Sequence, residues 1–140
     1  MLDALGARLG IDLDRAHVLL GAAIHDAGKI EHPHEMHAPG HDHEGAGESL
    51  LLRAGFAPEI ARACVTHAAW SEPRATLEDR CIALADKLWK GKRDEALEGA
   101  LLGELAARTG RARWDVFDAL DAICDDVARR GPERLARSVV

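Results

Sequence analysis

The stretch LDRAHVLLGAAIHDAGK, residues 13–29, decides the fold class of this chain. Its apolar positions recur at alternating intervals of four and three, which is the spacing of one face of a helix. That face consists of Leu13, His17, Leu20, Ile24 and Ala27. His25 and Asp26 follow at the end of the helix, and an imidazole beside a carboxylate offers two ligands to a divalent metal ion. The stretch therefore predicts a helix that carries part of a metal site.

Helical periodicity extends along most of the sequence, which is rich in Ala, Leu, Glu and Arg and poor in β-branched and aromatic residues. We therefore expect an all-α fold. Residues 30–42 contain two prolines and a glycine, lack the periodicity, and are expected to form a loop. Helices are expected at about 3–9, from Asp12 to about 27, from Asp42 to Gly55, from Pro58 to about 70, at about 77–88, at 93–108, and at 112–130, where Gly131-Pro132 ends the last one.

The length of 140 residues suits a single compact domain, 1–140, that needs no disulfide to stabilise it. Cys64, Cys81 and Cys124 each fall on an apolar helical stripe and are expected to be core residues of a protein from a reducing compartment. The C-terminal helices carry no cluster of metal-binding side chains. We expect them to serve packing, with a surface for homo-oligomerisation as a further use.

The formal charge of −6 argues against binding of a nucleic acid polymer, which requires a basic face. A small phosphorylated ligand remains compatible with this charge. The first residues do not resemble a signal peptide, and no stretch approaches the roughly 18 apolar residues of a membrane span. The sequence therefore predicts a cytoplasmic protein that does not bind a membrane.

Three residues downstream of His25 and Asp26 can complete a metal site. His43 shares a helical face with Gly47 and with Leu50 or Leu51, and His67 follows Ile60 and Cys64 at intervals of four and three. Asp86 lies beside an apolar helical stripe. Asp26 is the candidate for a bridging carboxylate, with His25 and Asp86 on one metal ion and His43 and His67 on a second. A metal-bound water can titrate near pH ~7 and act as a nucleophile.

The motifs His25-Asp26-Ala27-Gly28-Lys29, His43 with Gly47, His67, and Ala85-Asp86-Lys87-Leu88 resemble the successive motifs of the HD-domain superfamily over about residues 12–90. The resemblance implies a helical bundle, here with a C-terminal extension at about 93–137. It implies a metal-dependent phosphohydrolase that acts on a nucleotide or another small phosphate ester. It assigns His25, Asp26 and Asp86 as core ligands and His43 and His67 as ligands of two-metal members. The spacing is also similar to that of small bacterial HD hydrolases that split dinucleoside tetraphosphates.

One ligand of the superfamily pattern has no counterpart in this chain. The pattern begins with a histidine on a helix well before the His-Asp pair, and this chain starts too late to contain it. His17 lies eight residues before His25, roughly 12 Å along the helix, and is a poor substitute. His37 and His41 in the expected loop have more freedom to reach the metal, and a chain that begins upstream of Met1 is the other alternative.

Three lysines are candidates for substrate binding. Lys29 follows the His-Asp pair by one turn and is expected to contact a substrate phosphate, so that Asp26 and Lys29 form the catalytic pair. Lys87 and Lys90 lie close to Asp86 in the sequence and can attract an anionic substrate. The alternative for these two is a solvated helix end favoured by the helix dipole.

The sequence thus predicts a phosphohydrolase with one or two divalent transition metal ions, such as iron or manganese. Two alternatives stay open. A catalytically degenerate HD module would bind a nucleotide or a protein partner without turnover, as the absent histidine suggests. An HD-like diiron oxygenase would use further histidine ligands from the loop.

Overall fold

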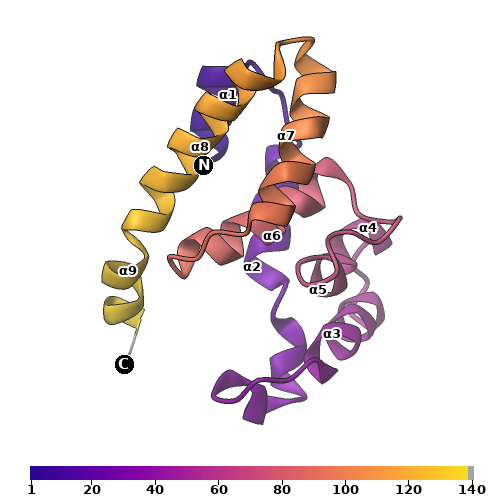
Figure 1. The fold of residues 1–140 in the computed structure, drawn as a ribbon. Helices are drawn as coiled ribbons and strands as arrows, with labels where there is room; N and C mark the ends of the chain where they lie inside the picture. Colours follow the sequence, from indigo (N-terminus) through magenta and orange to yellow (C-terminus); the bar gives the residue numbers. More distant parts are fainter. Residues whose placement is uncertain (139–140) are drawn as a thin grey trace. The chain divides into compact units, whose positions relative to one another are not determined.

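The computed structural model describes residues 1–138, and every regular element in that range is helical (Figure 1). The all-α prediction is confirmed. The α-helices are α1 (Leu2–Leu9), α2 (Arg15–Ile24), α3 (Asp42–Arg53), α4 (Pro58–Ala61), α5 (Ala63–Thr66), α6 (Leu77–Trp89), α7 (Glu95–Thr109), α8 (Arg113–Arg129) and α9 (Gly131–Ser138), and the 3₁₀ helices are η1 (Ala27–Ile30) and η2 (Pro33–Met36). None of the helices described combines the length and the apolar character needed to cross a bilayer.

Three segments differ from the expected pattern of helices. The expected loop at 30–42 contains η2, which Pro33 starts because its fixed φ suits a first helical position. The helix expected from Pro58 to about 70 is divided at Arg62 into α4 and α5, where backbone bonds from Ile60 N to Ala57 O and from Val65 N to Arg62 O tighten the helix. Gly131-Pro132 ends α8 but also begins α9, again with proline in a first turn.

The chain forms two compact units, residues 15–83 and residues 1–14 together with the described residues from Leu84 onward. The boundary falls within α6. Each unit is described by itself below, and the single domain expected from the length stays a prediction.

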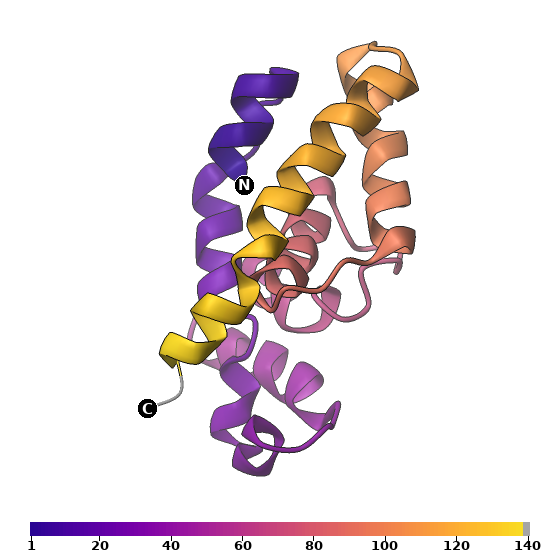
Figure 2. The ribbon, with the colours of Figure 1, turned by 60° about the vertical axis from the view of Figure 1, so that its left-hand side comes forward.

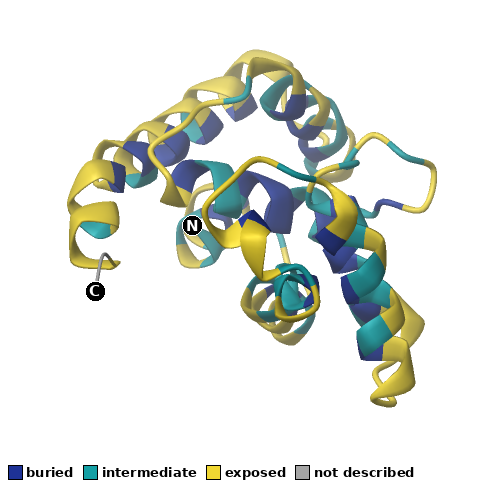
Figure 3. Cartoon of the chain, turned by 90° about the horizontal axis from the view of Figure 1, so that it is seen from below, coloured by how far each residue is buried: buried dark blue, intermediate teal, exposed yellow. Residues whose placement is uncertain are grey.

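In the unit of 1–14 and 84 onward, α7 and α8 are long helices that pack side by side, and α1 packs against α8 (Figure 2). Their buried residues recur at helical spacing and include Leu97, Leu101 and Leu105 on α7 and Val116, Leu120, Ile123 and Cys124 on α8. Figure 3 colours the buried positions of the chain dark blue. The helices expected at 93–108 and 112–130 are therefore confirmed to within two residues. Trp114 and Phe117, expected on the apolar face of α8, are instead exposed and stack on each other.

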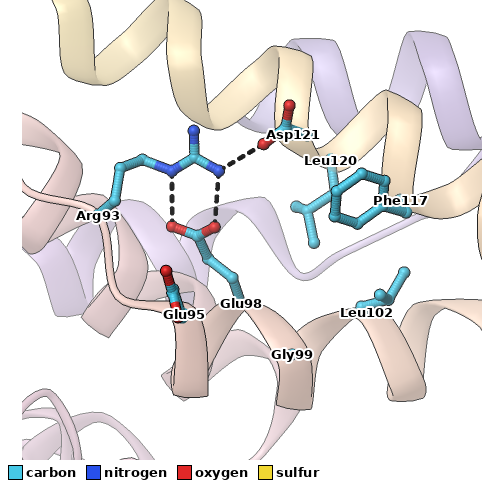
Figure 4. A pocket seen from close by; sticks show the side chains of 8 residues that line it. All are labelled: Arg93, Glu95, Glu98, Gly99, Leu102, Phe117, Leu120 and Asp121. Carbon is cyan, nitrogen blue, oxygen red and sulfur yellow. Dashed lines mark hydrogen bonds and ion pairs between the residues drawn. The ribbon is translucent and has the colours of Figure 1, made fainter.

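A cavity of about 300 Å³ lies beside α7 and α8 in this unit (Figure 4). At its polar end the Arg93 guanidinium donates two hydrogen bonds to Glu98, at 2.8 and 2.7 Å, and one to Asp121 at 2.7 Å. Leu102 and Phe117 lie at the apolar end. The charged groups that Figure 4 joins by dashed lines are therefore paired with one another.

In the unit of 15–83, the residues on either side of the His-Asp pair pack against the core. Leu51, Ala61 and Cys64 form a buried cluster against which Ile24 and Ala27 pack. All three cysteines are buried and form no disulfide among the described residues, which confirms them as core residues, and burial raises the pKa of the Cys64 thiol to about 11. On α2 the buried residues are Val18 and Gly21, whereas Leu20, expected on the buried face, is 40% exposed.

Asp79 forms a buried polar network in the same unit. Its backbone N–H donates to the Thr76 hydroxyl at 3.3 Å, and the Thr76 N–H donates back to its carboxylate at 2.9 Å, as in a capping box. Arg62 donates to the same carboxylate at 2.8 Å, and His17 Nε2 lies 3.5 Å from it. His17 thus lies beside Asp79 and belongs to neither group of candidate metal ligands found among the described residues.

Candidate metal centre

Two glycines set the position of Asp26 relative to His43. A Cβ on Gly28 would overlap the His43 carbonyl oxygen and lie 2.6 Å from the Gly47 nitrogen, and a Cβ on Gly47 would lie 2.9 Å from the Gly28 nitrogen. Only glycine allows the backbones of η1 and α3 to approach this closely. The His-Asp pair, just before η1, is thereby held beside the first turn of α3.

His25 lies in the turn that follows α2. Its Nδ1 is 2.8 Å from the carbonyl oxygen of Ala22, and because a carbonyl only accepts, Nδ1 carries the proton of this hydrogen bond. In the neutral ring, Nε2 then has the free electron pair. Nε2 lies 3.7 Å from Asp26 Oδ2.

His43 is a buried residue at the start of α3. Its Nδ1–H donates to the Glu35 carboxylate, and the backbone N–H of His43 donates to the same carboxylate at 3.2 Å. The buried Nε2 has no hydrogen-bond partner among the described residues and lies 3.3 Å from Asp26 Oδ1. Glu35 therefore fixes both the tautomer and the orientation of the ring.

His67 directly follows α5. Its Nδ1 lies 3.2 Å from the carbonyl oxygen of Ala63, and its Nε2 lies 3.9 Å from Asp26 Oδ1. Its ring centroid is 4.7 Å from that of His25 and 5.9 Å from that of His43. The three imidazoles therefore lie around one carboxylate.

All three imidazoles share one arrangement, in which Nδ1 bonds to a backbone or carboxylate oxygen and Nε2 faces Asp26. Metal-bound histidines in proteins characteristically donate the second ring N–H in this way. His25, Asp26 and His67 each offer a ligand atom within 4.8 Å of the others. The geometry thus groups His67 with His25, whereas the sequence suggested that His67 pairs with His43.

Asp26 is held in its ionised form. Partial burial acts to raise its pKa, but the 2.7 Å hydrogen bond from Lys29 Nζ and the charges of His25, Lys29 and His67 outweigh this effect and lower the pKa. A carboxylate that is ionised at neutral pH can bind a metal ion without first losing a proton. In the structure Lys29 thus contacts the expected bridging carboxylate directly.

Asp86, Lys87 and Lys90 belong to the other unit, so their place at this centre stays a prediction. Within that unit, Lys90 Nζ donates to Asp86 Oδ2 at 2.7 Å. Lys87 Nζ lies 3.0 Å from Asp94. Each candidate substrate lysine therefore has a carboxylate partner.

The loop histidines do not join the cluster around Asp26. His37 and His41 are both exposed, and His41 Nδ1 bonds to Glu44 at 2.9 Å. Neither belongs to the ligand groups found among the described residues. Their role as additional ligands gains no support.

Glu35 is the residue of the candidate centre that the sequence did not reveal. It is 6% exposed, although it lies on η2 between Pro33 and Gly40, where polar residues are expected at the surface. Burial acts to raise its pKa, but hydrogen bonds from the His43 ring and from the backbone N–H groups of His43 and Asp42 lower it to about 2. The only sequence signal is Gly40, where a Cβ would overlap the Glu35 carboxylate.

The sequence model of the HD domain family matches residues 1–89, more than half of the 140 residues. The match includes His25, Asp26, His43, His67 and Asp86. Comparison with curated proteins finds no match, and comparison with solved structures finds none either. The helical fold and the cluster of imidazoles around Asp26 agree with the family match, and the chain belongs to the HD domain family, which is generally associated with metal-dependent phosphohydrolases.

Proposed function

We propose that this protein is a metal-dependent phosphohydrolase that acts on a nucleotide or another small phosphate ester. The observation that carries the proposal is the arrangement of His25, His43 and His67, whose Nε2 atoms face the ionised Asp26 while each Nδ1 bonds to an oxygen. Three imidazoles and a carboxylate are a ligand set for one or two first-row divalent ions. Asp86 is proposed as a further ligand by its match to the family motif.

A divalent ion held by these residues would supply Lewis acidity and would lower the pKa of a bound water toward neutrality. The chain's own residues prepare the site for it. Ala22 O, Glu35 and Ala63 O fix the three rings, so that the ligand atoms need little rearrangement. Asp26 has two oxygens directed at different neighbours, Oδ1 at His43 and His67 and Oδ2 at His25 and Lys29, as suits a bridging carboxylate.

Lys29 is proposed to bind the phosphate of the substrate. Its ammonium group pairs with Asp26 Oδ2, so it lies where an oxygen of a bound phosphate would meet both a cation and the metal site. Lys29 is thus the cation that an anionic substrate would meet beside Asp26, and we expect Lys29→Gln to raise KM more than it lowers kcat.

The acidic chain suits a small phosphate ester better than a nucleic acid polymer. Lys87 and Lys90 are proposed as further substrate contacts, which requires them to exchange their carboxylate partners for phosphate oxygens. The similarity of the motif spacing to enzymes that split dinucleoside tetraphosphates makes these compounds the first substrates to test.

The test is a panel of nucleotides, dinucleoside polyphosphates and simple phosphate esters, incubated with protein loaded with Mn²⁺, Fe²⁺ or Co²⁺. Phosphate or nucleotide release is measured before and after chelation. We expect release that depends on the metal and falls by at least about 100-fold in Asp26→Ala. His37→Gln, which alters an exposed histidine outside the cluster around Asp26, should retain activity.

Each of the other outcomes points to a different function. Tight nucleotide binding without turnover across the panel would support the degenerate module and overturn the proposal. Oxygen uptake that requires both Fe²⁺ and an organic substrate would support the diiron oxygenase. The exposure of His37 and His41 gives that alternative no added support.

A further inference from the structure

A second group of metal-binding side chains includes Glu35, the carboxylate that also bonds to the His43 ring. His32, Glu35 and Asp42 each offer a ligand atom, and these atoms lie within 4.8 Å of one another. We propose that this group is an accessory site for a divalent transition metal ion such as Zn²⁺. It shares no ligand with the cluster of His25, Asp26, His43 and His67, and we call it the outer site.

Glu35 has an electron pair left for the outer site. Each carboxylate oxygen can accept two hydrogen bonds. Oε2 accepts from the ring and from the backbone N–H of His43, which uses both of its positions. Oε1 accepts only the Asp42 backbone N–H, at 3.1 Å, among the bonds found in the described residues. Its second position is therefore available to a cation.

The outer site has a fourth candidate ligand. His34 Nε2 lies 3.7 Å from Glu35 Oε1, and its ring centroid is 6.0 Å from that of His32. Imidazole nitrogens and carboxylate oxygens are both donors that Zn²⁺ accepts, and four of them match its usual coordination number. His34 and Asp42 are exposed, so an ion can enter from solvent, while Glu35 provides a rigid buried ligand.

The local fold holds the Glu35 carboxylate of the outer site in a fixed position. Gly40 allows the chain to pass directly over the Glu35 carboxylate, because a Cβ there would overlap it. Two backbone N–H groups at the start of α3 hold the carboxylate in place. With Glu35 and Asp42 ionised, the site carries two negative charges, which favours a cation over an anion.

An ion at the outer site would connect η2 to the first turn of α3 through Glu35. Because Glu35 also orients His43, the ion would restrain a side chain that positions the inner centre. The inference thus goes beyond the proposed function, since the outer site can bind an ion whether or not the inner centre hydrolyses phosphate.

The test removes the inner ligands first, so that failure of the proposed function cannot alter the result. Zn²⁺ binding to the full chain is measured by calorimetry and metal analysis in Asp26→Asn/His67→Gln. We expect this variant to bind one Zn²⁺ ion per chain. Adding His32→Gln and Asp42→Asn should weaken that binding by at least about tenfold. Adding His37→Gln and His41→Gln, which alters two exposed histidines of the same segment, should leave it unchanged.

A second comparison covers the case in which the inner variant does not fold. In the otherwise unaltered chain, His32→Gln/Asp42→Asn should reduce the Zn²⁺ stoichiometry by one, whatever number the inner centre holds. Equal stoichiometry in this variant and the unaltered chain would overturn the proposal. Equal loss of binding in the His37→Gln/His41→Gln control would do so too, because it would show diffuse capture by loop histidines.

Discussion

The two units of this chain achieve their folds by different means. In residues 1–14 and 84 onward, long helices bury apolar stripes, and the capping residue Asp94 and the left-handed Gly110 mark where α7 begins and ends. In residues 15–83, the elements around the candidate metal centre are short, two glycines bring backbones into contact, and Glu35 and Asp79 are buried. The first arrangement follows from hydrophobic periodicity, whereas the second depends on particular residues at particular places.

This difference teaches that the centre is positioned by backbone contact rather than by a wide apolar interface. The contact of Gly28 with His43 and Gly47 joins the segment of the His-Asp pair to α3. A helix with an apolar stripe can shift slightly when one side chain changes. Two backbones that are already in contact cannot shift to make room for an added side chain.

The most disruptive change is therefore expected at Gly28. In Gly28→Ala the new methyl group would collide with backbone atoms of α3 that cannot rotate away. We expect a loss of about 4 kcal/mol or more in the free energy of unfolding, measured by urea denaturation, together with loss of metal binding. The matched control is Gly45→Ala on α3, where a Cβ meets nothing within 4 Å. It should stabilise the protein by about 0.5–1 kcal/mol. An equal change in unfolding free energy in the two variants would show that backbone contact at Gly28 does not position the centre.

A cavity in the helical stripe of the other unit should affect stability alone. Leu105 is 1% exposed on α7, so Leu105→Ala is expected to lose about 3 kcal/mol of unfolding free energy. Under conditions where the variant stays folded, its metal affinity should equal that of the unaltered protein, because α7 carries no proposed ligand. A large loss of metal affinity in the folded variant would contradict the contrast between the units.

Glu35 and Glu44 provide a sharper comparison, since each bonds to a histidine but only Glu35 is buried. In Glu35→Gln the neutral amide is a weaker acceptor for the His43 ring. We expect metal affinity to fall by about 10- to 100-fold, as measured by calorimetry. Glu44→Gln, which breaks the pair with the exposed His41, should change it less than about twofold. A similar loss in both variants would show that net charge, not positioning, is responsible.

The smallest effect is expected at the start of α7. Asp94 accepts the Leu97 backbone N–H at 3.0 Å, and this bond, followed by that to Lys87, lowers the pKa of Asp94. Asp94→Ala should cost about 1 kcal/mol of unfolding free energy at pH 7. Because the pKa is lower in the folded state, this stabilisation is complete above pH ~4 and declines as the pH falls through the lowered value. Unfolding curves from pH 7 to 3 should show the gap between the two proteins narrowing, and Asp115→Ala, in the first turn of α8, is the control.

The sequence predicted the helices of the first unit more completely than the residues around Asp26 in the second. The bounds of α7 and α8 were predictable because Leu97, Leu101 and Leu105, and the residues of α8, repeat every three or four positions. The exposure of Trp114 and Leu20 was not predictable, since apolar residues at the edge of a stripe face solvent when no neighbour covers them.

At the centre, helical faces and family motifs predicted that His25, Asp26, His43 and His67 are relevant, and the structure brings these four together. Glu35 could not be predicted from periodicity, because it lies on a short 3₁₀ helix and is buried only through the close approach of Gly40. Its partner, the first turn of α3, is eight residues away along the chain.

The most direct test of the account is the metal content of the protein at equilibrium with Co²⁺, compared with that of Asp26→Asn. The optical spectrum of bound Co²⁺ reports its ligands and does not depend on knowing the substrate. We expect Asp26→Asn to lose at least one ion per chain and His37→Gln to lose none. Equal metal content and equal spectra in the unaltered protein and Asp26→Asn would contradict it, because Asp26 would then not be at the centre of a metal site.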